Sequence, residues 1–201
     1  WQTLSYAASF FNLLFGILVI VIITDEFTFR TFRQQVIDGL SRAELVLAKF
    51  YVILGLGALS TLFLLILGLF FGLQHTSDLN ANAVFGKMDT LAYYFVQAIG
   101  YMVLALVFAI LIKRSGLAII AFIAYAQVIE PLIHFRLPDV YDKYMPVKVL
   151  KSLTPMPGQG LLDQMTTPTE QLTQQQAALF AIGYIALFLL IAYTILNRRD
   201  L

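Results

Sequence analysis

Three stretches of the chain, residues 1–24, 50–73 and 90–112, contain no charged side chain. A bilayer core about 30 Å thick requires about 20 apolar residues in an α-helix, so each stretch is long enough to cross a membrane. Two further stretches complete the set, because residues 115–129 are uncharged up to Glu130 and residues 177–196 are uncharged. The pattern predicts an all-α, polytopic membrane helical bundle that forms a single transmembrane domain over residues 1–201. The five expected spans cover about residues 3–24, 49–73, 90–112, 115–133 and 177–197.

The composition supports this class of protein and argues against others. Apolar residues make up 60% of the 201 residues and charged residues 12%, which is about half the charged fraction of a soluble domain. The 13 basic and 12 acidic side chains nearly balance and give no indication of a nucleic-acid partner. The absence of Cys excludes disulfides, thiolate metal sites and thiol nucleophiles. We therefore expect a multi-pass protein of the plasma membrane, or the bacterial inner membrane.

Lys and Arg are concentrated in one set of the segments between the spans, as is typical of cytoplasmic segments. Eight of them fall within the 32 residues of segments 25–49, 113–114 and 197–201. Five fall within the 59 residues of segments 74–89 and 134–176. The first set, and with it the C-terminus, is therefore predicted to be cytoplasmic. Five spans then leave Trp1 outside, and one further span upstream would make six.

The segment between the first two spans has the pattern of a short amphipathic helix, expected at about residues 28–39. Apolar side chains recur at helical spacing on one face, namely Phe29, Phe32, Val36, Ile37 and Leu40. The opposite face carries Arg33, Gln34 and Asp38. Gly39 is the expected helix stop, and Ser41 with Glu44 forms a capping box that starts the next helix at once. Amphipathicity leaves two alternatives, a helix lying in lipid headgroups and a helix docked into a soluble partner.

The same segment resembles the coupling-helix region of type-2 ABC exporter permeases. The resemblance rests on Glu26, on Thr31-Phe32-Arg33-Gln34-Gln35, on Ile37-Asp38-Gly39-Leu40-Ser41-Arg42, and on Lys49 at the mouth of a span. The closing Asn197-Arg198-Arg199-Asp200-Leu201 also resembles the tail on which many members of that family end. The order of the five spans is similar too, so the resemblance covers the whole chain. One departure is Arg30, where the family usually has Gly. Because the family has six spans, its first span is expected to be absent here.

The resemblance implies a transmembrane permease subunit that moves a substrate with energy from a separate ATPase. The implied partners are cytoplasmic ABC ATPase subunits, a second permease copy or a homologous permease, and the lipid bilayer. No phosphate-binding loop is present, since Gly86-Lys87 lacks both the earlier Gly and the following hydroxyl. We therefore expect no enzyme activity and no cofactor in this chain, with ATP and Mg²⁺ on the partner ATPase. The residues implied in ATPase coupling are Glu26, Thr31, Phe32, Arg33, Val36, Ile37, Asp38, Gly39, Ser41 and Arg42. Of these, Phe32, Val36 and Ile37 are expected to contact the ATPase.

Polar side chains along the first span are candidates for lining a transport path. Ser5, Ser9 and Asn12 recur with Gly16 on one face of an otherwise apolar helix. Such a stripe faces protein or water rather than lipid, because small residues permit close approach and polar ones need partners. Plain helix packing and path lining both remain open as its role.

The fourth span is the other polar one, with Gln127 and Glu130 on one face and Pro131 expected to interrupt the helical hydrogen bonds after Glu130. An ionisable residue within a span is a candidate functional residue. Glu130 is expected in the outer third of the bilayer. It either reaches headgroup water or pairs with Arg136, or it forms an outer gate or a substrate contact. The candidate path-lining residues are therefore Ser5, Ser9, Asn12, Gln127 and Glu130.

The predicted outer segment 134–168 is too apolar for a solvated linker. Its apolar side chains are Val140, Tyr141, Tyr144, Met145, Val147, Val149 and Leu150, and Pro and Gly divide it into short pieces. Short helices dipping into the outer interface are therefore expected, and the resemblance implies re-entrant helices at this place. His134 has no metal ligand at suitable spacing, so no metal site is predicted.

Three other classes of membrane protein are alternatives to the permease. An intramembrane hydrolase is disfavoured, because the sequence has no G-x-S-x-G, no H-E-x-x-H and no paired acids on a membrane helix. A non-transporting, ATPase-coupled membrane scaffold and an ion-coupled secondary carrier both stay open. Fold does not determine cargo, so the substrate is not assigned.

Overall fold

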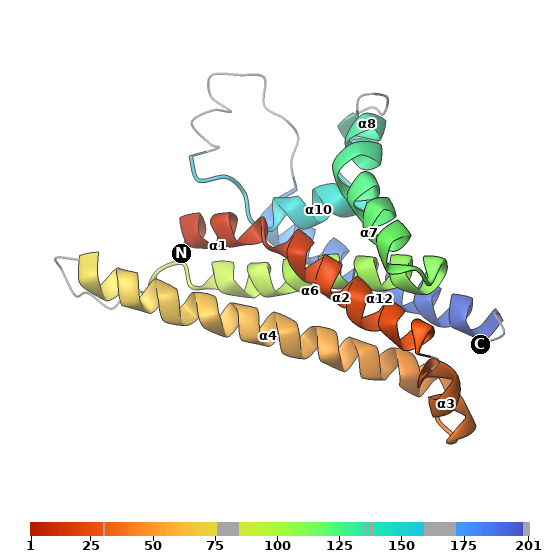
Figure 1. Ribbon diagram of the computed structural model, residues 1–201. Helices are drawn as coiled ribbons and strands as arrows, with labels where there is room; N and C mark the ends of the chain where they lie inside the picture. The colour runs from red at the N-terminus through yellow and green to blue at the C-terminus, as the bar shows by residue number, and fades with distance from the viewer. Residues whose placement is uncertain (30, 76–84, 135, 137–138, 159–171, 199–201) are drawn as a thin grey trace.

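The computed structural model describes residues 1–29, 31–75, 85–134, 136, 139–158 and 172–198, and every regular element in these ranges is helical. Figure 1 shows an elongated bundle of long helices with shorter helices packed against it, one of them at the end where the C-terminus lies. The helices are α1 (Gln2–Ser9), α2 (Asn12–Thr28), α3 (Thr31–Ile37), α4 (Arg42–His75), α6 (Asp89–Ile112), α7 (Ser115–Ala124), the π-helical segment η1 (Tyr125–Ile129), α8 (Glu130–His134), α9 (Asp139–Asp142), α10 (Pro146–Ser152) and α12 (Gln174–Arg198).

Four helical stretches in the described ranges are long and apolar enough to cross a membrane, and the pair α1 and α2 makes up to five. The four are Arg42–Gln74, Asp89–Ile112, Ser115–His134 and Gln174–Arg198. These helices confirm the predicted all-α, polytopic membrane bundle. The first span differs from the prediction, because α1 and α2 are bent by 42° at Phe10 and Phe11.

Helix α6 is the core of the bundle, and α2, α4, α7 and α12 all pack against it. In its apolar window 67% of the residues are buried, against 22% to 28% in the other three candidate spans. The other helices turn large apolar side chains outward, for example Leu59 and Phe63 on α4 and Leu179 on α12. An exposed apolar surface of this extent suits a hydrocarbon environment rather than water.

The polar connection between α2 and α4 forms a tight elbow. Helix α3 ends at Ile37, and Gly39, the predicted helix stop, follows it with a φ of +102°, which favours glycine. The Gly39 N–H donates to the Val36 carbonyl at 3.2 Å and the Leu40 N–H to the Gln35 carbonyl at 3.1 Å, which is a Schellman motif. The predicted capping box of Ser41 and Glu44 at the start of α4 is also confirmed.

In the capping box, the Ser41 N–H donates to Glu44 Oε2 at 2.7 Å, and the Glu44 N–H donates back to Ser41 Oγ at 3.3 Å. Two helix ends with only a few residues between them therefore have defined geometry. The predicted bounds of the amphipathic helix, 28–39, are wrong at the N-terminal side. Helix α2 continues to Thr28, and α3 covers only Thr31–Ile37.

The fourth span stays helical past Pro131, and its hydrogen-bond pattern changes just before this residue. Proline has no N–H to donate to the preceding turn. The chain adopts the π-helical segment η1 just before this point, and the Glu130 N–H donates to the Tyr125 carbonyl five residues earlier. The helix then continues as α8 to His134.

The predicted outer segment 134–168 contains two short helices, α9 and α10, where it is described; residues 135, 137–138 and 159–168 lie outside the described ranges. Val147, Val149 and Leu150 of α10 are buried, and α10 packs against α6 and α12. Gly100 of α6 makes this approach possible, because a Cβ at that position would overlap the Leu150 side chain. Helix α10 is therefore packed into the bundle against α6 and α12.

Candidate functional site

An ion pair joins the end of α2 to the beginning of the second span. The Lys49 ammonium on α4 contacts the Glu26 carboxylate on α2, with side-chain exposures of 10% and 22%. Thr31 Oγ1 at the start of α3 donates to the Glu26 carbonyl at 3.1 Å. The base of the elbow therefore brings together three residues of the sequence motif, Glu26, Thr31 and Lys49.

Aromatic and cationic side chains continue this cluster. The Phe32 ring stacks on Phe27 with centroids 4.5 Å apart and an interplanar angle of 6°. The Lys49 ammonium lies 5.3 Å from the Phe32 centroid, and the Lys113 ammonium, from the connection between α6 and α7, lies 5.2 Å from the Phe27 centroid. Such cation–π contacts hold a partly desolvated cation in place. The elbow is therefore fixed to α2, α4 and the α6–α7 connection.

The predicted contact of Phe32 with an ATPase is corrected by this geometry. Phe32 is 2% exposed, so it anchors α3 to the bundle and offers no surface to a partner. The predicted apolar face is divided, because the chain breaks between α2 and α3 and Phe29 belongs to the end of α2. Val36 is half-buried, whereas Ile37 is 76% exposed.

Three apolar side chains of the elbow are exposed. We call them the elbow patch, and they are Phe29, Ile37 and Leu40, which are 75%, 76% and 43% exposed. Asp38 and Gly39 are exposed beside it. Arg33 lies within α3, but its side chain is outside the described part of the chain.

Arg42 joins the elbow to the other end of the sequence. Its Nη1 donates to the Leu196 carbonyl of α12 at 2.9 Å and also to the Asn197 carbonyl. A cation at a helix C-terminus satisfies carbonyls that have no helical partner. The three segments predicted to be cytoplasmic therefore meet at one end of the bundle, where Figure 1 shows α3 and the C-terminus.

The polar stripe of the first span faces α6. Ser5 and Asn12 are buried, and Asn12 Nδ2 donates to Gln97 Oε1 at 3.2 Å. Thr154 Oγ1 donates to the same oxygen at 3.0 Å. Gly16 lies against Phe122, since a Cβ on Gly16 would be 2.6 Å from Phe122 Cζ. For Ser5, Asn12 and Gly16 the helix-packing alternative is therefore the one observed.

Ser9 and Gln127 meet at a different place, a cavity of about 440 Å³ beside α10. Polar side chains from four elements line it, namely Ser9, Gln97, Gln127, Lys148, Lys151 and Ser152. Its apolar wall includes Tyr6, Phe10, Leu13 and Met156. Of the five predicted path-lining residues, only Ser9 and Gln127 line this cavity.

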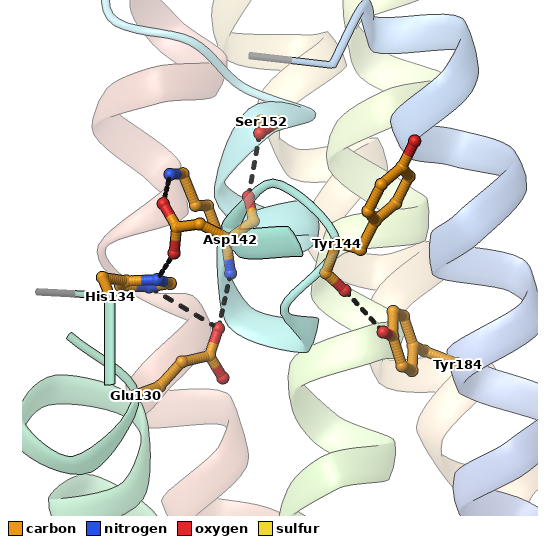
Figure 2. Close-up of polar contacts among 7 residues, drawn as sticks. Glu130, His134, Asp142, Tyr144, Ser152 and Tyr184 are labelled. Carbon is orange, nitrogen blue, oxygen red and sulfur yellow. Dashed lines mark hydrogen bonds and ion pairs between the residues drawn. The ribbon is translucent and has the colours of Figure 1, made fainter. Parts of the chain in front are cut away.

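Glu130 is placed differently from the favoured sequence interpretation, in which it reached headgroup water or paired with Arg136. The side chain is fully buried, and Oε1 accepts the Lys148 backbone N–H at 2.8 Å (Figure 2). His134 Nε2 lies 4.0 Å from the same oxygen, while Arg136 is exposed. The sequence gives no local signal that α10 folds back over Glu130, and for that reason the position next to water was favoured.

Asp142 contacts Lys148 and His134, and we call Glu130, His134, Asp142 and Lys148 the carboxylate cluster. The Asp142 carboxylate pairs with the Lys148 ammonium and with His134 Nδ1, as Figure 2 shows. Burial raises the pKa of the Asp142 carboxyl, but the hydrogen bonds and charges of Lys148 and His134 outweigh burial and hold the pKa below its ordinary value. Helices α8, α9 and α10 are thereby joined by ionic contacts around one carboxylate.

Comparison with known families identifies the chain at the level of family alone. A family model described as a protein of unknown function, DUF2705, matches residues 1–201. The chain belongs to the DUF2705 family. No curated protein matches its sequence. Because the DUF2705 match covers the full length, the elbow, the cavity and the carboxylate cluster all lie within the family domain.

Several residues of these sites in the DUF2705 chain were not predicted. Gln97 could have been found, because it is a polar residue in the middle of a charge-free span. Asp142, Lys148 and Thr154 lie among short helices and turns, where no periodicity indicates which side chains meet. Within the described ranges, no group of three or more acidic, His or Cys side chains has a metal-binding arrangement.

Proposed function

We propose that this protein is the transmembrane permease subunit of an ATP-binding cassette transporter, driven by a separate cytoplasmic ATPase. The observation that carries the proposal is Ile37, an apolar side chain 76% exposed on a helix whose opposite side is held by Phe32. A short helix that is fixed by the buried Phe32 and that exposes the apolar Ile37 suits a rigid docking element. The resemblance of residues 26–49 to a coupling-helix region supports the same assignment.

The contacts of the elbow are suited to passing a movement of α3 into the membrane domain. The Glu26–Lys49 pair joins α2 to α4, and Lys49 also lies over Phe32 of α3. The capping box at Ser41 leaves little slack between α3 and α4. Arg42 extends the connection to α12. A partner that displaces α3 would therefore act on three long helices.

We further propose that the elbow and the C-terminus are cytoplasmic, in the plasma membrane or a bacterial inner membrane. The support is the excess of Lys and Arg in the segments that meet at the elbow end. A second copy of the chain or a homologous permease completes the assembly, because a single subunit of this size encloses only part of a path.

Purification of the tagged protein in mild detergent from its native membranes tests the proposal. We expect an ABC ATPase to copurify and to hydrolyse ATP. Ile37→Glu places a charge in the elbow patch and should reduce the copurified ATPase by at least about tenfold, since burying an unpaired charge at an interface is costly. Val36→Glu should have the same direction of effect.

Tyr141→Glu is the matched control, because Tyr141 is 68% exposed but lies outside the elbow. It should leave the copurified ATPase unchanged. Wild-type protein that brings down no ATPase and supports no ATP turnover would contradict the proposal. Equal loss with Ile37→Glu and Tyr141→Glu would remove the elbow patch from the docking surface.

A further inference from the structure

The cavity beside α10 lies where two membrane helices depart from regular geometry. On one side is the bend between α1 and α2, and Ser9 and Phe10 at this bend line the cavity. On the other side is the π-helical segment η1, which carries Gln127. Irregular backbone at membrane depth is tolerated where it is buried in protein or lines a polar cavity, and π-segments are frequent at functional sites. Both irregularities therefore indicate a site rather than a packing defect.

The polar wall of the cavity is held in fixed positions. Gln97 lies in the wall and accepts hydrogen bonds from Asn12 and Thr154, at 3.2 and 3.0 Å. All three side chains are nine-tenths or more buried. A buried network of this kind fixes the orientation of the amide that the cavity presents.

The electrostatics of the cavity favour an anion. Lys148 and Lys151 both line it, but the Lys148 ammonium is paired with Asp142. Lys151 is exposed and has no carboxylate partner among the described residues. The buried Glu130 is not in the lining, and its carboxylate accepts the Lys148 backbone N–H. One uncompensated positive charge therefore faces the cavity.

The opposite wall of the same cavity is apolar. Phe10 is 64% exposed and Met156 is 48% exposed, so both present hydrocarbon at the opening. A volume of about 440 Å³ is within the range of pockets that hold a small organic ligand. We propose that this cavity binds the anionic headgroup of an amphiphile, with its phosphate at Lys151 and its glycerol and first acyl carbons along Phe10 and Met156. The inference goes beyond the proposed function, because such binding requires neither an ATPase nor transport.

Native mass spectrometry of the purified chain in nonionic detergent tests this site. The probes are dihexanoyl phosphatidylglycerol, dihexanoyl phosphatidylcholine and inorganic phosphate. We expect one phosphatidylglycerol per chain, bound about tenfold more tightly than phosphatidylcholine. Lys151→Gln should weaken phosphatidylglycerol about fivefold, the effect of one lysine near an anionic lipid. It should leave phosphatidylcholine unchanged.

Two further variants make the outcome specific. Arg136→Gln removes an exposed charge that does not line the cavity and should leave phosphatidylglycerol binding unchanged. Phe10→Ala should weaken phosphatidylglycerol by removing the apolar wall. Equal affinity for the two lipids, or equal effects of Lys151→Gln and Arg136→Gln, would overturn the proposal. So would full competition by inorganic phosphate at equal concentration, because the cavity would then bind a free anion and make no use of its apolar wall.

Discussion

Lys49 on α4 forms an ion pair with Glu26 on α2, across 23 residues of sequence that include all of α3. The same ammonium lies over the ring of Phe32, which belongs to α3. A single cation therefore contacts the helix before the elbow, the helix within it and the helix after it. This contact makes the elbow a rigid part of the membrane domain.

Removal of one partner of the Glu26–Lys49 pair should destabilise the protein more than removal of both. Glu26→Gln or Lys49→Met leaves a poorly solvated charge, which costs about 3 to 5 kcal/mol in fully buried pairs. The side chains here are 10% and 22% exposed, so we expect about 2 kcal/mol for each single variant. The midpoint of thermal unfolding in detergent measures the effect.

The double variant Glu26→Gln/Lys49→Met supplies the comparison. It leaves no isolated charge, so its midpoint should lie closer to that of the wild type than either single variant does. A double variant whose loss equals the sum of the two single losses would mean that the two side chains do not interact.

Gly16 should not tolerate a larger side chain. A Cβ there would lie 2.6 Å from Cζ of Phe122, which is fully buried and has little room to move. Gly16→Ala should therefore cost about 1 to 3 kcal/mol through overpacking, and Phe122→Leu in the same chain should recover part of it. Thermal unfolding in detergent compares the variants.

Gly55 is the control for helix propensity, because no atom lies within 4 Å of a Cβ built there. Gly55→Ala should be neutral or stabilising by up to about 1 kcal/mol. If Gly16→Ala were equally harmless, the close packing of α2 against α7 would be wrong.

The predicted spans and the elbow illustrate what the sequence could supply. Charge-free length identified the membrane helices, and the short-range signals at Gly39, Ser41 and Glu44 identified both helix ends. These features depend on residues within one helical turn of each other, so periodicity and capping rules reach them.

The features that were missed depend on contacts between distant segments. Phe32 was expected on the docking face, but its stacking with Phe27 across the α2–α3 break turns it inward. Glu130 was expected near water, but α10 covers it, and its hydrogen-bond partner Lys148 lies 18 residues further along the chain. No local pattern in the sequence encodes either contact.

The lowered pKa of Asp142 determines how the stability of the carboxylate cluster should depend on acid pH. This pKa is held below the ordinary value, so the folded protein stabilises the ionised Asp142 carboxylate, and this contribution is fully present above the unfolded-state pKa of about 3.9. This stabilisation is lost only as the pH falls through the still lower folded-state pKa. The difference in unfolding midpoint between wild type and Asp142→Asn should therefore persist at pH 5 and shrink below about pH 4.

Arg136→Asn provides the baseline for general acid effects, since Arg136 is exposed near the same cluster. Its midpoint should follow that of the wild type across the whole pH range. A difference between wild type and Asp142→Asn that has already vanished at pH 5 would show that the carboxylate is not stabilised as described.

Photo-crosslinking from position 37 reports whether the elbow patch contacts an ATPase. A photoreactive amino acid replaces Ile37 in the full chain in native membranes, with Tyr141 replaced in a parallel sample, and the crosslinked products are identified by mass spectrometry. We expect an ATPase adduct from position 37 and none from position 141. Crosslinks from position 37 to lipid alone would contradict this expectation, because α3 would then be an interfacial helix lying in the headgroups.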